Sequence, residues 1–227
     1  MNEILFFSFV VLCLVVVLLA FKLGKLYLFA AIAMFTVLMN IFVLKQFDLF
    51  GYAVTGGNVL YGALFLITDL LSEHYSKKDA LQAVRIGFFT SVFFVLALQF
   101  LLAFTPNDYD FAHSSMQTLF SLSPRILMAS MLSYLIVQHI DVYIFDALKR
   151  RFSNKLWLRN LGSTLLSQAL DTLLFTTLGL LTVASLGLAG VVPPEAFIEV
   201  LVITYVIKIV VALIDTPFMY LSYKIKK

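Results

Sequence analysis

Residues 4–21 read ILFFSFVVLCLVVVLLAF and contain no charged side chain. A helix needs about 20 apolar residues to cross the hydrocarbon core of a bilayer, so this stretch predicts a transmembrane helix. No basic segment precedes it and no small-residue cleavage site follows it, so we do not expect a cleaved signal peptide. The whole chain has the same character, because 62% of its 227 residues are hydrophobic and 13% are charged. A soluble domain has about 25% charged residues.

Long apolar runs recur along the chain, and their length predicts helices that cross a membrane. The expected spans are residues 4–21, 26–46, 57–73, 82–104, 123–148, 161–188 and 196–222. The longest connections, about 105–122 and 149–160, are too short to bury a soluble core. The sequence therefore predicts an all-α fold, a polytopic membrane helical bundle of seven transmembrane helices in one domain covering residues 1–227.

The basic residues predict how this bundle is oriented. Cytoplasmic connections carry an excess of Lys and Arg. Thirteen of the sixteen Lys and Arg residues fall in connections that would share one side: Lys22, Lys25, Lys77, Lys78, Arg85, Lys149, Arg150, Arg151, Lys155, Arg159, Lys224, Lys226 and Lys227. We therefore expect the N-terminus outside and the C-terminus in the cytoplasm of a cell (inner) membrane. The net charge of +3 comes from this asymmetry and does not indicate nucleic-acid binding.

Five ionisable residues lie inside the apolar segments: Asp69, Asp141, Asp171, Lys208 and Asp215. Each costs about 2.5–3.5 kcal/mol at the centre of a bilayer on insertion scales, so such residues normally face a bundle interior or a wet cavity. They are the first indication of a functional site.

The ionisable residues belong to polar stripes. Side chains three, four and seven positions apart share a helix face. The stripes are Asn58, Gly62, Phe65 and Asp69; Ser130, Tyr134, Gln138 and Asp141; Thr164, Gln168, Asp171 and Phe175; and Thr204, Lys208, Val211 and Asp215. Four helices with one polar stripe each predict a polar site between them.

Depth separates the ionisable residues. At 1.5 Å per residue, Asp171 lies about 15 Å from the inner end of its segment and Lys208 about 18 Å from the outer end of the next. Both positions are near the midplane, where the two residues either serve a substrate or form a structural ion pair that fixes helix register. Asp69 is either an inner-gate residue or solvated at the cytoplasmic surface. Asp215 precedes Pro217, and a helix kink explains it as well as a site does.

Other classes of protein lack support. The chain has no His-Glu-x-x-His, Gly-x-Ser-x-Gly or P-loop motif, so we expect no enzyme and no ATPase. No spacing of His, Cys and carboxylates resembles a metal site, and we expect no cofactor.

One block of sequence has a specific resemblance. Residues 57–75, GNVLYGALFLITDLLSEHY, followed by Ser76-Lys77-Lys78-Asp79-Ala80, resemble the queuosine precursor transporter family, also called the vitamin-uptake-transporter-like family. Later blocks around Arg125–Phe145, Ser163–Thr172 and Tyr205–Tyr220 agree with it in order. Ser76 stands where the family often has Gly. Shorter relatives have six helices, which implies a six-helix core plus an added N-terminal helix.

The resemblance implies import of 7-deazaguanines (preQ0, preQ1 or queuine) used in tRNA modification, with a purine-like small molecule and the lipid bilayer as partners. It implies a substrate-binding set of Asn58, Tyr61, Phe65, Asp69, Arg125, Tyr134, Gln138, Asp141, Gln168, Asp171 and Lys208. Within this set the acids accept from the edge of the base, the amides assist, Lys208 balances charge or contacts the ring carbonyl, and the aromatic rings, with Phe175, stack.

Several alternatives stay open at this point. The chain is a transporter acting alone, the substrate-binding subunit of an ATP-driven uptake complex, or a non-transporting membrane scaffold. Neither the energy coupling, the preferred 7-deazaguanine nor the presence of a homo-oligomer follows from the sequence.

Overall fold

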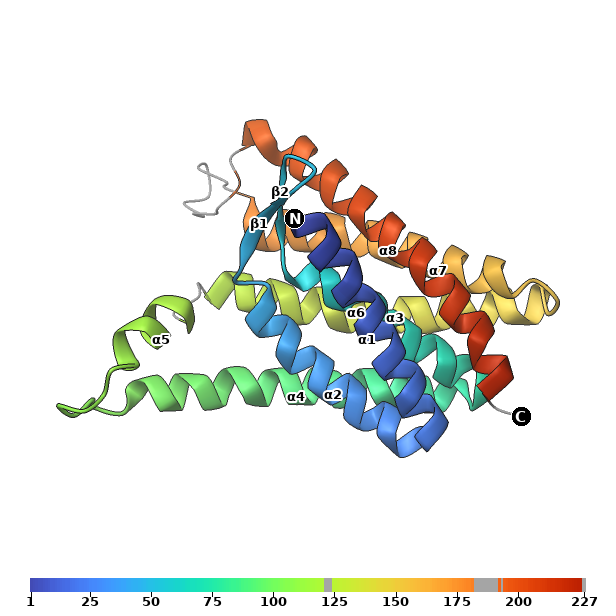
Figure 1. Ribbon diagram of the computed structural model, residues 1–227, viewed down its shortest axis with the longest axis horizontal. Helices are drawn as coiled ribbons and strands as arrows, with labels where there is room; N and C mark the ends of the chain where they lie inside the picture. Colours follow the sequence, from blue (N-terminus) through green and yellow to red (C-terminus); the bar gives the residue numbers. More distant parts are fainter. Residues whose placement is uncertain (121–123, 182–191, 193, 226–227) are drawn as a thin grey trace.

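The computed structural model describes residues 1–120, 124–181, 192 and 194–225, and of residues 124–127 only the backbone. The elements in chain order are α1 (Asn2–Leu23), α2 (Lys25–Phe42), β1 (Gln46–Leu49), β2 (Tyr52–Thr55), α3 (Gly57–His74), α4 (Lys77–Ala103), α5 (His113–Phe120), α6 (Pro124–Arg151), α7 (Leu156–Phe175), a π-helical turn (Thr176–Leu180), a 3₁₀ turn (Pro194–Ala196) and α8 (Phe197–Ile225). The helices form one bundle, with α3 behind α1 in the view of Figure 1.

Each of the seven expected segments lies on a helix of this bundle, with shifted ends. The helix expected at 161–188 begins earlier, at Leu156, and the regular α-helix ends at Phe175, where a π-helical turn follows. The remainder of that expected segment, residues 182–188, falls outside the described part of the chain. The helix expected at 82–104 begins at Lys77, because Ser76 caps it by accepting a hydrogen bond from the Asp79 backbone N–H at 3.1 Å.

The fold is almost wholly helical, as expected, and a small β-hairpin is added to the helices. β1 and β2 pair antiparallel, and the turn between them places Phe50 at φ 54° and Gly51 at φ 85°. Two positive φ angles are typical of a tight hairpin turn whose twist matches its strands. The hairpin docks on α1 through Asn2, which donates to the Asp48 carbonyl at 2.8 Å. Strands of four residues without an Asn-Gly turn gave no signal above the apolar background.

Helix α3 is the centre of the bundle. It contacts α1, α2, α4, α6 and α8, and nearly every residue from Gly57 to Ser72 is buried. Gly62 permits the close approach of α8, because a Cβ at this position would lie 2.7 Å from Val211 Cγ1. A polar residue on α3 therefore faces other helices in whichever direction it points.

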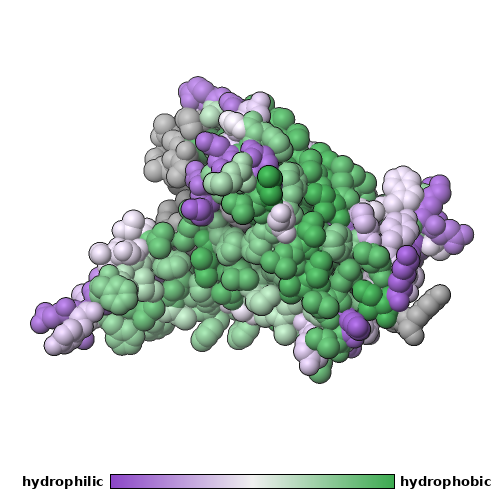
Figure 2. Space-filling view, in the orientation of Figure 1, coloured by the Kyte–Doolittle hydropathy of each residue, from purple (hydrophilic) through white to green (hydrophobic). Residues whose placement is uncertain are grey.

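The outer surface is apolar. Large side chains such as Phe89 and Phe100 of α4 are 72% and 74% exposed. Figure 2 shows hydrophobic side chains covering the middle of the visible face, with hydrophilic ones gathered at its two ends. An exposed apolar surface of this kind is typical of a protein surrounded by lipid. Among the described residues, α1, α2, α4, α6 and α8 contain stretches long and apolar enough to cross a membrane.

Two of the seven expected spans, the helices α3 and α7, are not among these long apolar helices. α3 and α7 carry the buried polar residues Asp69, Asn160, Gln168 and Asp171, which lower their hydropathy. The connections α1–α2, α3–α4 and α6–α7 and the C-terminus share one end of the bundle, while the N-terminus and the hairpin lie toward the other (Figure 1). The basic connections therefore lie together, as the charge pattern predicts.

Candidate functional site

An ion pair between α7 and α8 lies inside the bundle. Lys208 Nζ donates to Asp171 Oδ2 at 2.6 Å, and the two side chains are only 4% and 2% exposed. The sequence predicts that both residues lie near the midplane, and in the structure their side chains are in direct contact. Because both charges are withdrawn from solvent, each depends on the other for its stability.

Two aromatic rings of α3 adjoin this pair. The Lys208 ammonium lies 4.2 Å from the centroid of the Tyr61 ring, a cation–π contact. Tyr61 and Phe65 are stacked, with ring centroids 6.3 Å apart and planes inclined by 23°. The buried pair (Asp171 and Lys208) and the two rings therefore place an acceptor, a donor and flat apolar surfaces at one point between three helices.

A second polar group, the inner acid cluster, comprises Asp69 of α3, Asp141 of α6 and Asp215 of α8. All three residues have no exposed surface, and Asp69 interacts electrostatically with both of the others. Asp215 accepts a hydrogen bond from Asn160 Nδ2 at 2.8 Å. The four carboxyl oxygens of Asp69 and Asp141 have no hydrogen-bond partner in the described part of the protein.

Uncharged polar groups without partners lie on α7. Gln168 is fully buried, and neither its amide nitrogen nor its amide oxygen is hydrogen-bonded within the described ranges. The same holds for the hydroxyls of Thr164 and Ser167. Because buried polar groups are normally satisfied, such a concentration indicates a place built to contact something other than the protein itself.

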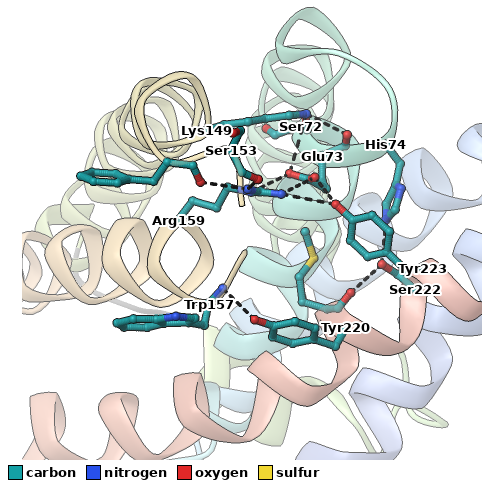
Figure 3. Close-up of polar contacts among 12 residues, drawn as sticks. Ser72, Glu73, His74, Lys149, Ser153, Trp157, Arg159, Tyr220, Ser222 and Tyr223 are labelled. Atoms are coloured by element: carbon teal, nitrogen blue, oxygen red, sulfur yellow. Dashed lines mark hydrogen bonds and ion pairs between the residues drawn. The ribbon is translucent and has the colours of Figure 1, made fainter. Parts of the chain in front are cut away.

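The inner network joins the end of α3 to the neighbouring helices through Glu73, Arg159, Tyr223 and Lys149, and Figure 3 shows its hydrogen bonds. Arg159 of α7 donates to both carboxylate oxygens of Glu73, at 3.0 Å from Nε and 2.7 Å from Nη2. The Tyr223 hydroxyl donates to the same carboxylate. Lys149 of α6 donates to the Ser72 and Glu73 carbonyls at 2.7 and 2.8 Å, so it caps the end of α3. Residues of α3, α6, α7 and α8 are thereby tied together.

The structure separates the sequence-predicted residues. Asp171, Lys208, Tyr61 and Phe65 lie together, and Asp69 and Asp141 lie in the inner acid cluster. Gln138 accepts a hydrogen bond from Thr68 at 3.4 Å, which ties α6 to α3 beside that cluster.

Three further predicted residues are placed only in part by the described structure. Asn58 is buried in the first turn of α3. The Tyr134 hydroxyl packs against Gly87 of α4, so its ring is turned toward α4. Arg125 lies in the first turn of α6, and its side chain is outside the described part. Phe175 ends α7 and contacts Gly179.

The sequence analysis underestimated the burial of two residues, Asp215 and Arg159. The kink explanation of Asp215 is insufficient, because this residue is wholly buried and hydrogen-bonded to Asn160. Arg159 counted only as a loop charge, yet its side chain is 5% exposed and holds Glu73. A sequence signal for the burial of Arg159 was present, since Arg159, Ser163, Ser167 and Asp171 continue one stripe at four-residue spacing.

Metal binding gains no support, because the residues described contain no group of three His, Cys, Asp or Glu able to hold an ion.

Taken together, an apolar outer surface around a buried, partly unsatisfied polar interior is typical of a multi-pass membrane protein that handles a polar molecule. Comparison with known proteins agrees. The sequence profile of the family described as "Putative vitamin uptake transporter" matches residues 55–222. The chain therefore belongs to this family, as the block at residues 57–75 indicated. The description of the family is that of a transporter.

A relative from Bacillus subtilis (strain 168), named "Probable queuosine precursor transporter", is 36% identical over 226 residues, which cover 98% of this chain and 95% of the relative. The similarity thus includes α1, which precedes the part matched by the family profile. No solved structure matches the chain.

Proposed function

We propose that this protein imports queuosine precursors, which are 7-deazaguanine bases, across the cell membrane. The observation that carries the proposal is the buried Asp171–Lys208 pair beside the stacked Tyr61 and Phe65 rings. The name of the B. subtilis relative supports the same substrate class.

The chemistry of the site fits a guanine-like base. A carboxylate accepts from adjacent N–H donors on the edge of such a base, and an ammonium donates to its ring carbonyl. Asp171 and Lys208 would supply these groups once the base inserts between them, with Gln168 as an additional amide partner. Tyr61 and Phe65 would cover the face of the base, because aromatic rings stack on flat π-systems. Breaking one buried ion pair while forming two charged hydrogen bonds keeps both charges compensated throughout binding.

The path through the protein follows α3. A single domain of seven spans, with the N-terminus outside and the C-terminus in the cytoplasm, would place Asn58 and Arg125 toward the outer mouth. The inner network would lie at the cytoplasmic exit. Release into the cell would require Glu73 and Arg159 to separate, because their hydrogen bonds hold α3 and α7 together at that end.

Uptake in cells tests the proposal. The chain is expressed in cells that can neither synthesise preQ0 nor import precursors, each precursor is fed, and queuosine is measured in tRNA. We expect rescue by the wild-type chain and by Asp146→Asn, a matched control on α6 whose carboxylate pairs with Lys77 near the helix end. We expect loss of rescue by Asp171→Asn when it is compared with the wild-type chain at equal membrane abundance. Failure of the wild-type chain with every precursor would refute transport and leave the scaffold interpretation.

The same cells decide whether a partner ATPase is needed. Rescue in a host without such an ATPase, and uptake by purified protein in ATP-free vesicles, would exclude the subunit alternative. Binding of preQ0, preQ1, queuine and guanine to the purified protein then ranks the substrates.

A further inference from the structure

The inner acid cluster is not explained by recognition of a base at Asp171 and Lys208. Along α3, Tyr61, Phe65, Asp69 and Glu73 follow one another at four-residue intervals on one stripe. Each interval advances about 6 Å along the helix. Asp69 therefore lies between the Tyr61 and Phe65 rings on one side and the inner network on the other. It is about one helical turn from Phe65 and one from Glu73.

The three carboxyls of this cluster have no cationic partner in the part of the chain that the structure describes. Lys208 is bound to Asp171, and both Arg159 and Lys149 are bound at Glu73. The remaining ion pairs of helices packed around α3 lie near the helix ends and join Lys25 to Asp79, Lys77 to Asp146 and Arg150 to Asp146. Among the residues that α1 buries in the described structure, the one titratable side chain is the thiol of Cys13.

An ionised carboxylate in such surroundings is strongly disfavoured, because it has lost water and gained no opposite charge. Three together are disfavoured further by mutual repulsion. The described acids offer no arrangement able to hold a metal ion. The simplest species that removes the excess negative charge is a proton bound to a carboxyl oxygen.

Neighbouring polar groups point to the same ligand. The Ser167 hydroxyl lies near Asp141, is fully buried, and makes no hydrogen bond of ordinary geometry among the described residues. The Asn160 side chain donates to Asp215 through Nδ2, while its Oδ1 has no partner within those residues. Free acceptor oxygens on several helices suit a proton that moves between them, directly or through water.

We propose that Asp69, Asp141 and Asp215 form a proton-binding site, and that import of the base is coupled to inward movement of a proton through it. This inference rests on the proposed function. The proton arrives from the outer side, is held on a carboxyl oxygen of the cluster, and leaves to water on the cytoplasmic side, so the cluster regains its negative charge.

The inner network supplies a physical link between proton and gate. Asp69 and Glu73 interact electrostatically across one turn of α3. A protonated cluster leaves Arg159 bound to Glu73, and the exit stays closed. Loss of the proton places negative charge beside Glu73, which repels it and competes for Arg159, so the closed arrangement is weakened. By linkage, the same interaction makes closure of the gate favour proton binding.

Purified protein in vesicles tests the coupling. With the medium more acidic than the lumen, labelled precursor accumulates above its equilibrium level, and adding precursor without a gradient acidifies the lumen, as a trapped pH-sensitive dye reports. Asp69→Asn, Asp141→Asn and Asp215→Asn lose gradient-driven accumulation and lumen acidification. Asp146→Asn retains both, because that carboxylate is paired outside the cluster. Wild-type uptake that ignores the gradient and moves no proton would overturn the coupling while leaving the proposed function intact.

A second readout does not depend on transport. Infrared spectra of the wild-type protein at neutral pH should contain the C=O stretching band of a protonated carboxylic acid. This band should shrink in the three cluster variants and persist in Asp146→Asn, with membrane abundance and thermal stability recorded for each. Fully ionised carboxyls in the wild-type spectrum would refute the proton site whether or not any precursor is transported. Absence of uptake together with a protonated-acid band would instead refute the proposed function and retain the site.

Discussion

Removing one member of the Asp171–Lys208 pair should be more damaging to stability than removing both. The bond is 2.6 Å long, and the side chains are 2% and 4% exposed, so either single change strands a buried polar or charged group. Stranding one partner of a buried pair costs about 3–5 kcal/mol. At roughly 2–4 °C per kcal/mol for a chain of this size, the unfolding temperature should fall by about 6–20 °C.

The assay is thermal unfolding in detergent of Asp171→Asn, Lys208→Met and the double variant, with Asp146→Asn as a control at an accessible pair. The double variant should recover most of the lost stability, because no unpaired charge remains. It should still fail in uptake, since loss of a hydrogen bond to a charged group costs about 1.5–3 kcal/mol, or about 10- to 150-fold in affinity. Full uptake by the double variant would show that the pair only fixes helix register.

Three more outcomes follow from the packing. Arg159→Met leaves the Glu73 carboxylate buried without its bidentate partner, so it should lower the free energy of unfolding by about 3–5 kcal/mol. Arg159→Lys should be less damaging. Equal thermal unfolding midpoints for wild type and Arg159→Met would contradict the burial of this pair. Gly62→Ala sets a Cβ 2.7 Å from Val211 Cγ1 and should lower the free energy of unfolding by about 1–3 kcal/mol. Adding Val211→Ala should restore this stability. If it does not, the loss does not come from contact with Val211. Asn107→Cys, between α4 and α5, should react with an impermeant maleimide in intact cells, since the one native thiol is buried; labelling only after lysis would reverse the orientation.

The class of the protein, the placement of its helices and its family were available from the sequence. Runs such as residues 4–21 are long and uncharged, and in a bilayer length and polarity alone decide whether a helix can cross. The block at residues 57–75 indicated the family. The sequence also placed Asp171 and Lys208 near the same depth, which is consistent with the ion pair that the structure contains.

Only the tertiary structure decided which of the polar residues meet. Periodicity places a residue on a helix face but does not say which neighbour that face contacts, so Tyr134 was grouped with the site although it packs on Gly87 of α4. The burial of Asp215 and Arg159 depends on neighbouring helices distant in sequence, which supply Asp69 and Glu73. A helix's own sequence sets its polarity, whereas the rotation of each helix against its neighbours arises from packing of the whole bundle.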